Sequence, residues 1–195
     1  MTHLSLFASG VLAMSLTLPV AALAQHGGRI DVPDVPSSIA VPDGHVVFLQ
    51  TRAYGTQQYV CVPGGWKPFG PQATLYPQNA PMQIATHFLS INPIDGMPRP
   101  TWQDAHDGSA VWGKVFGQPL TDPNYVAAGA VAWLLLEAAG TAAGPIGGEV
   151  LAKTTFIHRV NTQGGVAPAG ACTVGAIALV PYSTDYFFYR DGRSQ

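Results

Sequence analysis

Residues 86–115 (THFLSINPIDGMPRPTWQDAHDGSAVWGKV) gather the side chains most able to do chemistry in this chain. The segment holds two of the six histidines and two of the four tryptophans. An imidazole can exchange protons near neutral pH, and an exposed indole can stack on a sugar or another flat ligand. We therefore predict a binding face for a small molecule, a glycan or a cell-surface component, built from His87, Trp102, Asp107 and Trp112.

The same segment allows an enzymatic alternative, a hydrolase or metal-dependent enzyme that uses the His87 and Asp107 region. The weak metal candidates are His87, His106 and His158, but no two of them have the H-x-H or H-x₃-H spacing of a preformed site. Asp107 also suits a turn, where an aspartate bonds its own backbone. A triad with Ser109 requires that folding bring it to His87 and Asp107. The chain has no G-x-S-x-G or H-E-x-x-H motif. We favour a non-enzymatic protein without metal or cofactor.

Two further charged residues lie inside apolar segments. Arg159 interrupts the stretch 156–160, and Asp185 lies among aromatic residues near the carboxyl end. A buried guanidinium needs a carboxylate or carbonyl groups around it. We expect Asp185 to pair with Arg159, either as a structural ion pair or as a polar anchor for a ligand.

The elements that must position these residues read as β-strands. Segments 46–51 and 56–62 flank Tyr54-Gly55, which we interpret as a hairpin turn. Asp107-Gly108, between Trp102 and Trp112, is a second hairpin signal. Residues 90–100 carry three prolines and read as a loop.

The second half of the chain continues in the same manner. Segment 131–138 is the most apolar part outside the amino terminus, and we interpret it as a core strand. Segments 150–162, 174–180 and 182–190 are further strand candidates. The sequence therefore predicts an all-β fold, a β-sandwich or jelly-roll-like barrel of about eight to ten short strands with long Gly/Pro-rich loops.

Composition narrows the class of partner. Charged residues make up 10% of the chain, whereas about 25% is usual in a soluble domain. The net charge is -2. The chain has no basic cluster, which argues against nucleic acid and anionic membrane as partners. The hydrophobic fraction of 47% is enough for a folded core.

The amino terminus reads as an export signal. Residues 4–20 are apolar and are followed by Ala22-Leu23-Ala24, an A-x-A cleavage site. We expect a signal peptide over 1–24, an extended arm over 25–44 and a single β domain over 45–195. The protein would then be secreted or periplasmic, and it would not be an integral membrane protein, because no later apolar run is long enough to span a bilayer. The oligomeric state stays open.

Cys61 and Cys172 are the only cysteines. In an exported protein, two cysteines far apart in sequence most simply form one disulfide. A metal site or a reactive thiol is the less favoured alternative, because neither cysteine has a C-x-x-C neighbour.

A set of short motifs in a fixed order runs along nearly the whole chain after residue 54. The motifs are GTQQYVC (55–61), Trp66, PQATL (71–75), THF (86–88), TW (101–102), DGS (107–109), WLL (133–135), RVNTQGG (159–165), AP (167–168), Cys172 and YSTDYFFY (182–189). In this order they resemble the domain-of-unknown-function family 3455, secreted proteins of bacteria and filamentous fungi. The resemblance implies an all-β fold, supports the disulfide, and implies no established activity.

The chain differs from the resembled family in one segment. Many relatives connect the histidine to the tryptophan by a compact link, whereas here residues 88–101 separate His87 from Trp102. If a ligand binds between these residues in relatives, this protein would hold a different one. Some relatives are labelled malate dehydrogenase. We expect no NAD-dependent dehydrogenase here, because the chain lacks a G-x-G-x-x-G motif after a strand and a βαβ alternation.

Three functional hypotheses remain. The first is an exported β protein that binds a small molecule or cell-surface component. The second is the enzyme described above, which requires three or more titratable groups in one concave pocket. The third is a structural envelope protein without a pocket, in which the aromatic residues are buried and residues 87–109 form a sealed corner.

Overall fold

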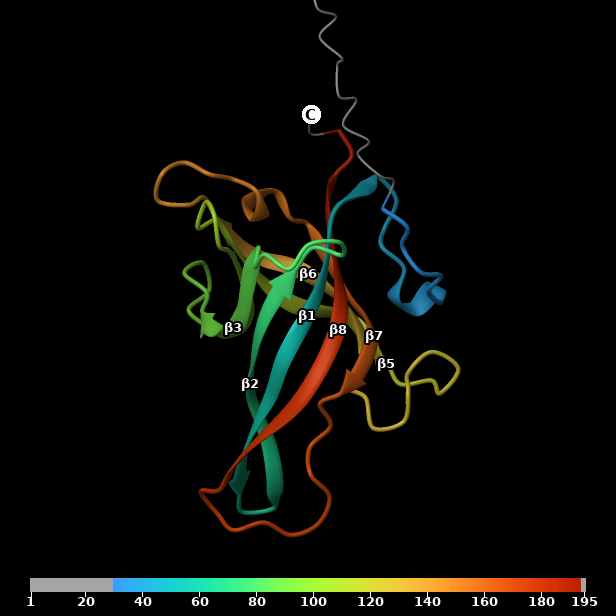
Figure 1. Ribbon diagram of the computed structural model, residues 1–195, viewed down its shortest axis with the longest axis vertical. Coiled ribbons are helices and arrows are strands. Elements are labelled where there is room, and N and C mark those ends of the chain that lie inside the picture. Colours follow the sequence, from blue (N-terminus) through green and yellow to red (C-terminus); the bar gives the residue numbers. More distant parts are fainter. Residues whose placement is uncertain (1–29, 194–195) are drawn as a thin grey trace, which may run out of the picture.

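The computed structural model describes residues 30–193, which form a closed barrel of eight antiparallel strands (Figure 1). Each strand pairs with its neighbour in sequence, and β1 pairs with β8 to close the ring. The strands are β1 His45–Val62, β2 Gly65–Tyr76, β3 Ala85–Ile91, β4 Pro98–Asp104, β5 Ala110–Leu120, β6 Trp133–Ala142, β7 Phe156–Gly164 and β8 Ile177–Asp191. Two short 3₁₀ turns, η1 Ser37–Ile39 and η2 Leu151–Lys153, complete the elements.

The all-β prediction is confirmed, but the arrangement differs from a sandwich or a jelly roll. Both of those folds stack two sheets, whereas here one sheet closes on itself in up-and-down order. The strands β1 and β8 have 18 and 15 residues and are longer than expected. Alternation of apolar and polar residues marks strands in either fold, so it does not tell two stacked sheets from one curved sheet.

The hairpin predicted at Tyr54-Gly55 is wrong, because β1 runs through both residues without a turn. The turn lies instead at Pro63-Gly64, between β1 and β2. A Cβ on Gly55 would lie 2.0 Å from the Gln72 carbonyl oxygen and 2.5 Å from the Ala73 Cα. Gly55 therefore serves the close approach of β2 to β1, a role that glycine also has inside strands.

The loop predicted at residues 90–100 is confirmed at residues 92–97, whereas the residues on either side belong to β3 and β4. Leu89 pairs with Pro100 and Ile91 with Pro98, so only the tip between β3 and β4 is a loop. Prolines are tolerated there because β5 pairs with β4 only at residues 101–103, which leaves this part of β4 at an edge. The long link between His87 and Trp102 is thus an extended hairpin. The hairpin predicted at Asp107-Gly108 is confirmed and joins β4 to β5.

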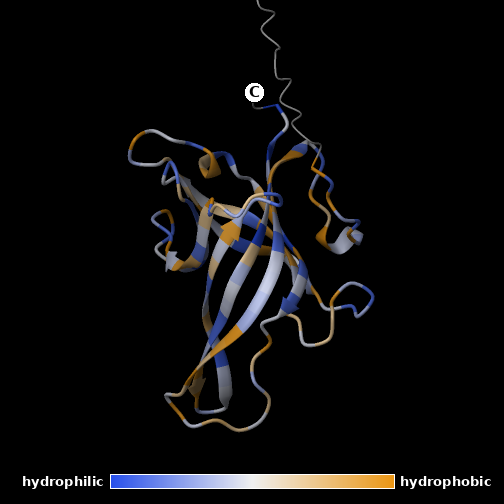
Figure 2. Ribbon diagram, in the orientation of Figure 1, coloured by the Kyte–Doolittle hydropathy of each residue, from blue (hydrophilic) through white to orange (hydrophobic). Residues whose placement is uncertain are grey.

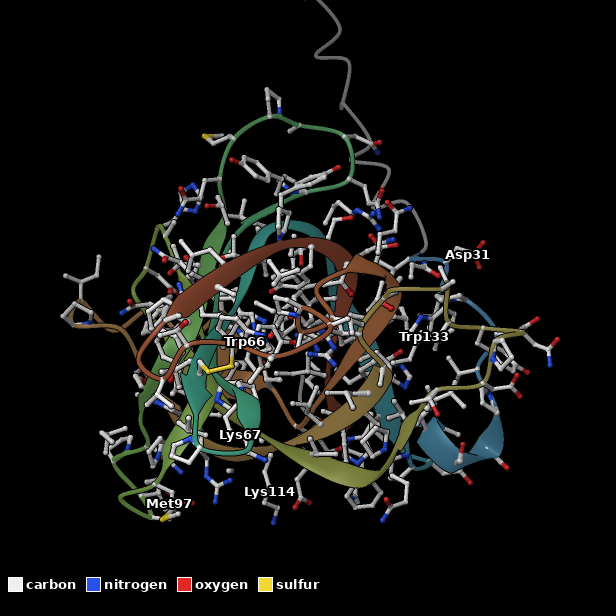
Figure 3. The ribbon with its side chains drawn as sticks, turned by 90° about the horizontal axis from the view of Figure 1, so that it is seen from below. Asp31, Trp66, Lys67, Met97, Lys114 and Trp133 are labelled. Carbon is white, nitrogen blue, oxygen red and sulfur yellow. A yellow bond between two sulfur atoms is a disulfide. The ribbon has the colours of Figure 1, made fainter. Side chains whose placement is uncertain are left out.

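Two apolar cores lie on opposite sides of the barrel wall. The inner core fills part of the barrel and includes Leu75, Trp102, Ile157 and Phe188. The outer core packs β6, β7 and β8 against residues 30–41, which we call the N-terminal segment. Figure 2 shows hydrophobic positions along this segment beside the barrel, and Figure 3 shows Trp133 on the side of the molecule where the segment lies.

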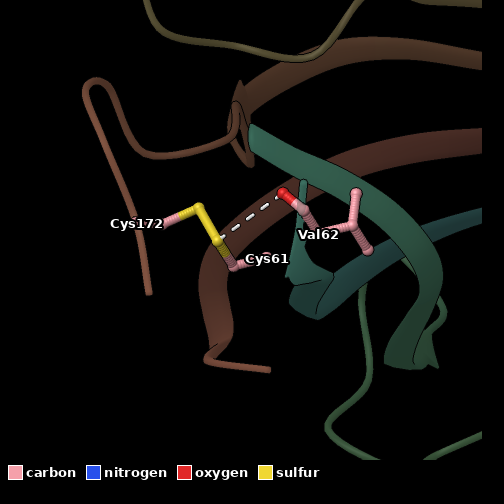
Figure 4. Close-up of a disulfide and its surroundings, with 3 residues drawn as sticks. All are labelled: Cys61, Val62 and Cys172. Carbon is pink, nitrogen blue, oxygen red and sulfur yellow. Dashed lines mark hydrogen bonds between the residues drawn. A yellow bond between two sulfur atoms is a disulfide. The ribbon is translucent and has the colours of Figure 1, made fainter. Parts of the chain in front are cut away.

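The predicted disulfide is confirmed. Cys61, at the end of β1, is bonded to Cys172 in the connection between β7 and β8 (Figure 4). Seen from below, it lies beside the tip of the β1–β2 hairpin near Trp66 (Figure 3). The Cys61 sulfur also contacts the Val62 carbonyl oxygen at 4.0 Å, a van der Waals contact because a disulfide sulfur carries no proton.

The predicted signal peptide over 1–24 and the first residues of the predicted arm lie outside the described residues. Within residues 30–193, no helix is long and apolar enough to cross a membrane. The division into an arm over 25–44 and a single domain over 45–195 stays a prediction.

Candidate functional site

A cavity of about 440 Å³ lies inside the barrel, between β2, β4 and β6. Most of its wall is apolar, and its polar side chains are few. The residues that line it are Gln57, Pro68, Phe69, Gly70, Pro71, His87, Leu89, Pro98, Pro100, Trp102, Val115, Leu134, Leu136, Arg159 and Tyr186. Phe69, Leu89 and Val115 are each about two-fifths exposed, so they lie where the cavity meets solvent.

Strand register places His87 beside Trp102 on the inner side of the barrel wall. Gly55, Ala73, His87 and Trp102 are paired in turn across β1, β2, β3 and β4 and form one row around the wall. The first two residues of the row have little or no side chain. An eight-stranded barrel is just wide enough for side chains to fill it or for one small ligand. Of these four residues, His87 and Trp102 line the cavity, and their stacked rings form one side of it.

Among residues 30–193, Arg159 is the one cationic residue that lines the cavity. Its Nε and Nη2 donate hydrogen bonds to the Ala132 carbonyl oxygen, at 3.2 and 2.9 Å. Among the described residues, no carboxylate lies within 4.0 Å of its guanidinium nitrogens. The predicted pairing with Asp185 is therefore wrong. The two residues lie on neighbouring strands but on opposite faces of the wall, because side chains alternate along a strand.

Asp185 lies on the outside of the barrel, in an ion pair with Arg52 at 3.1 Å. Its second carboxylate oxygen accepts a hydrogen bond from Asn161 Nδ2 at 2.8 Å. Arg52 also donates to Ser183 Oγ at 2.8 Å. A hollow of about 630 Å³ opens beside this group, next to Tyr54. Because these charged groups already satisfy one another, the outer hollow presents no uncompensated charge.

His87 is buried at the cavity wall, and its ring is held from two sides. It stacks on the Trp102 indole with ring centroids 4.1 Å apart and planes 12° apart, and its edge faces Tyr186. Its Nδ1–H donates to the Thr101 carbonyl oxygen at 2.8 Å. Burial lowers the pKa of His87 to about 3. The imidazole is therefore neutral near pH 7, and Nε2 is its acceptor.

Four more polar atoms in the barrel have no hydrogen-bond partner among the described residues: Gln57 Nε2, Trp102 Nε1 and the hydroxyls of Tyr182 and Tyr186. Burial raises the pKa of Tyr182 and raises that of Tyr186 further, so both phenols keep their protons. Arg159 is the register partner of Tyr186, and its charge acts against the rise in the pKa of both phenols. The Tyr182 hydroxyl interacts with Tyr186 and with Gln57, so these polar groups lie against one another and are closed to solvent.

Asp107 and Trp112 lie away from the cavity. Asp107 accepts hydrogen bonds from Ser109 N and Oγ at 2.7 and 2.6 Å, and from Val150 N at 2.9 Å. Burial raises the pKa of Asp107, but these hydrogen bonds outweigh it and hold the pKa below its ordinary value. Ser109 Oγ in turn accepts from Leu151 N at 2.9 Å. The group braces the β4–β5 turn and does not include His87, so the triad does not form.

Trp112 points to the outer face of the wall, where its Nε1 donates to Ser90 Oγ at 2.8 Å. It is the register partner of Thr101, whereas Val111 is the partner of the inward-facing Trp102. The structure therefore brings together three of the six predicted ligand residues, His87, Trp102 and Arg159. It leaves Asp107, Trp112 and Asp185 elsewhere.

The histidines do not converge. His106 is exposed near Asp104, and His158 is buried in the outer core, where it contacts the Ile39 carbonyl oxygen at 2.7 Å and the Tyr189 hydroxyl at 2.9 Å. Among the described residues, no three His, Cys, Asp or Glu side chains are grouped so that they could hold a metal ion. The candidate site is a cavity with apolar walls, a few neutral polar side chains and, among the described residues, one cation.

Sequence reasoning missed several lining residues. Tyr186 was not singled out, although its spacing of four residues from Tyr182 places both on the same face of a strand. Leu134 and Leu136, two residues apart on β6, likewise lie on the same face of their strand. No signal marked Gln57, because a single amide in a strand is as common on the outside of a sheet as on the inside.

Comparison with known proteins supplies the family. The family model described as a protein of unknown function (DUF3455) matches residues 42–190. No curated protein and no solved structure matches the chain. The matched range includes both cysteines and all eight strands, apart from the last residue of β8. The chain therefore belongs to the DUF3455 family of proteins of unknown function.

Proposed function

We propose that this protein is an exported binding protein that holds one small, mostly apolar molecule inside its barrel. The observation that carries the proposal is the cavity of about 440 Å³, which combines apolar walls with Arg159, a cation that has no carboxylate partner among residues 30–193. Sites for small molecules typically have volumes of about 300–1,000 Å³ and a few polar groups that fix orientation.

The cost of an empty cavity supports this proposal. Unfilled apolar space and unpartnered polar atoms both reduce the stability of a fold. The cavity beside Trp102 and Tyr186 is such a space, and Arg159 lines it. A ligand would fill the space and bring a partner to the Arg159 guanidinium.

The proposed location outside the cytoplasm has two supports. The disulfide between Cys61 and Cys172 is compatible with an extracellular location. The apolar segment 4–20 with its A-x-A site is typical of a secretory signal. We propose that the signal is cleaved near Ala24 and that the barrel works in the periplasm or outside the cell.

The other two hypotheses have less support. The hydrolase hypothesis needs His87 beside Asp107 or His106, and these residues belong to separate groups. The hypothesis of an envelope protein without a pocket does not account for the cavity.

The test is a binding titration with N-phenyl-1-naphthylamine, a neutral apolar dye whose fluorescence rises when it leaves water. We expect saturable binding at one site per chain. Val115→Trp places an indole at the cavity mouth and should weaken binding about tenfold or more, which is about 1.4 kcal/mol. The matched control is Val46→Trp, at a similarly exposed valine that does not line the cavity, and it should bind as the wild type does. Unsaturable binding, or equal loss in both variants, would refute the proposal.

A further inference from the structure

We infer that the ligand is a monocarboxylic acid with an apolar body, and that its carboxylate binds Arg159 inside the barrel. This inference rests on the proposed function and names the chemical class of the ligand. It starts from the charge on the cavity wall and continues with the hydrogen-bonding groups around that charge.

The guanidinium of Arg159 has hydrogen-bonding capacity to spare. Nε and one N–H of Nη2 are directed to the Ala132 carbonyl oxygen. Both N–H groups of Nη1 and the second N–H of Nη2 have no partner among residues 30–193. A guanidinium presents its donors as a planar fork that matches the two oxygens of a carboxylate. A partly buried cation without a counter-ion is unfavourable, and a bound anion removes that penalty.

The neutral polar side chains of the wall leave the guanidinium as the group that selects the ligand. Tyr186, the strand partner of Arg159 on β8, has a fully buried hydroxyl that interacts with Tyr182. Trp102 Nε1 and Gln57 Nε2 are also closed to solvent. Arg159 is partly exposed and lines the cavity, so a ligand that complements this wall must bring acceptor oxygens to its guanidinium.

The remainder of the wall determines the rest of the ligand. The cavity that Arg159 lines is also lined by Leu134, Leu136, Leu89 and Val115, whose side chains offer no hydrogen bonds. A single cation matches a single negative charge. A phosphate ester, which carries up to two charges near pH 7, would need a second cation, and the wall has none. The geometry therefore favours a carboxylate head with a hydrocarbon or aromatic body.

The experiment compares four ligands of equal chain length by displacement of the neutral dye: dodecanoate, dodecanol, dodecyl phosphate and dodecylamine. We expect the wild-type protein to bind dodecanoate about tenfold or more tightly than dodecanol, with the other two weaker than the acid. Arg159→Met should remove the preference for the acid and leave the affinity for dodecanol unchanged. Arg52→Met, which removes a cation from the outer face, is the matched control and should keep the preference.

The outcomes separate the two proposals. If the wild-type protein binds acid and alcohol equally, or prefers the phosphate or the amine, the carboxylate inference is wrong while the binding proposal stands. If no ligand displaces the dye and the dye itself does not bind, the binding proposal is wrong. The wild-type comparison needs no variant, so it decides the inference even if Arg159→Met does not fold. Arg159→Lys, which keeps the charge without the fork, should bind the acid more weakly than the wild type but still prefer it to the alcohol.

Discussion

The imidazole of His87 lies flat on the indole of Trp102, its cross-strand partner, with ring centroids 4.1 Å apart. The Thr101 carbonyl oxygen, next in sequence, accepts the Nδ1 proton at 2.8 Å. One strand thus provides both the surface that the ring covers and the hydrogen bond that fixes its tautomer. A charged imidazole would lose hydration in this position without gaining a counter-ion, and this loss is the cause of its low pKa.

The first prediction concerns pH. The pKa of His87 is about 3 in the folded protein and about 6.5 in the unfolded chain. Between these values the unfolded chain binds a proton that the folded protein does not. The free energy of unfolding should therefore decrease as the pH falls below about 6.5, by about 1.4 kcal/mol per unit at the steepest. Urea denaturation measured from pH 7.5 to 4 provides the slope.

His158 contributes to the same slope with the same sign, because burial also lowers its pKa. The share of each residue is the difference between the wild type and His87→Asn or His158→Gln. The slope for His87→Asn should be shallower than that of the wild type. An identical slope would show that His87 is not buried as described.

The second prediction concerns the disulfide. Cys61 and Cys172 are 111 residues apart, so the bond restricts a long loop of the unfolded chain. In the chain-entropy model, a loop of this length contributes roughly 4–5 kcal/mol. A double Cys→Ser variant should lose about that much free energy of unfolding, as measured by urea denaturation of the oxidised wild type and the variant. A loss below about 1 kcal/mol would contradict the expectation.

The third prediction concerns Gly55. Gly55→Ala places a methyl group against the backbone of Gln72 and Ala73, which cannot move without separating β1 from β2. We expect a loss of about 3 kcal/mol or more. Gly170→Ala is the control, because Gly170 has φ +89° but nothing within 4 Å of its added Cβ. Its cost should be about 1–2 kcal/mol, from the left-handed backbone alone. Equal losses of stability would show that the strands are not closely packed at Gly55.

The fourth prediction concerns the N-terminal segment. His158 joins this segment to β8, because one ring nitrogen contacts the Ile39 carbonyl oxygen and the other contacts the Tyr189 hydroxyl. His158→Ala should cost about 1–3 kcal/mol and should speed hydrogen exchange at residues 37–41 more than in the barrel strands. The control is His106→Ala, at an exposed turn. Uniform exchange across all strands would instead indicate global destabilisation.

The sequence predicted the class of fold and the disulfide but not the closure of the barrel. Apolar alternation and turn signals are local, and they located the hairpin at Asp107-Gly108 correctly. The pairing of β1 with β8 depends on residues more than a hundred positions apart, and no local pattern encodes it. Glycine and proline misled the prediction because both occur in strands as well as in turns. Gly55 allows two strands to approach closely, and Pro98 lies at the edge of a strand.

Half of the predicted ligand residues belong to the candidate site, and the other half do not, for a similar reason. His87, Trp102 and Arg159 are unusual residues within apolar strands, and each faces the cavity. Asp107, Trp112 and Asp185 are equally unusual but serve a turn or the outer face. The face on which a strand residue lies depends on register, and register is fixed by pairing with other strands.

Closure by β1 and β8 has a consequence for the order of folding. The strand pairs β1 to β7 can form one after another along the chain, but the ring stays open until residues 177–191 are present. Folds with such distant contacts form slowly. A chain that ends before β8 would expose β1 and β7 as two unpaired edges, which are templates for aggregation. Pairing of the last strand is therefore the step that converts an aggregation-prone curved sheet into a closed barrel.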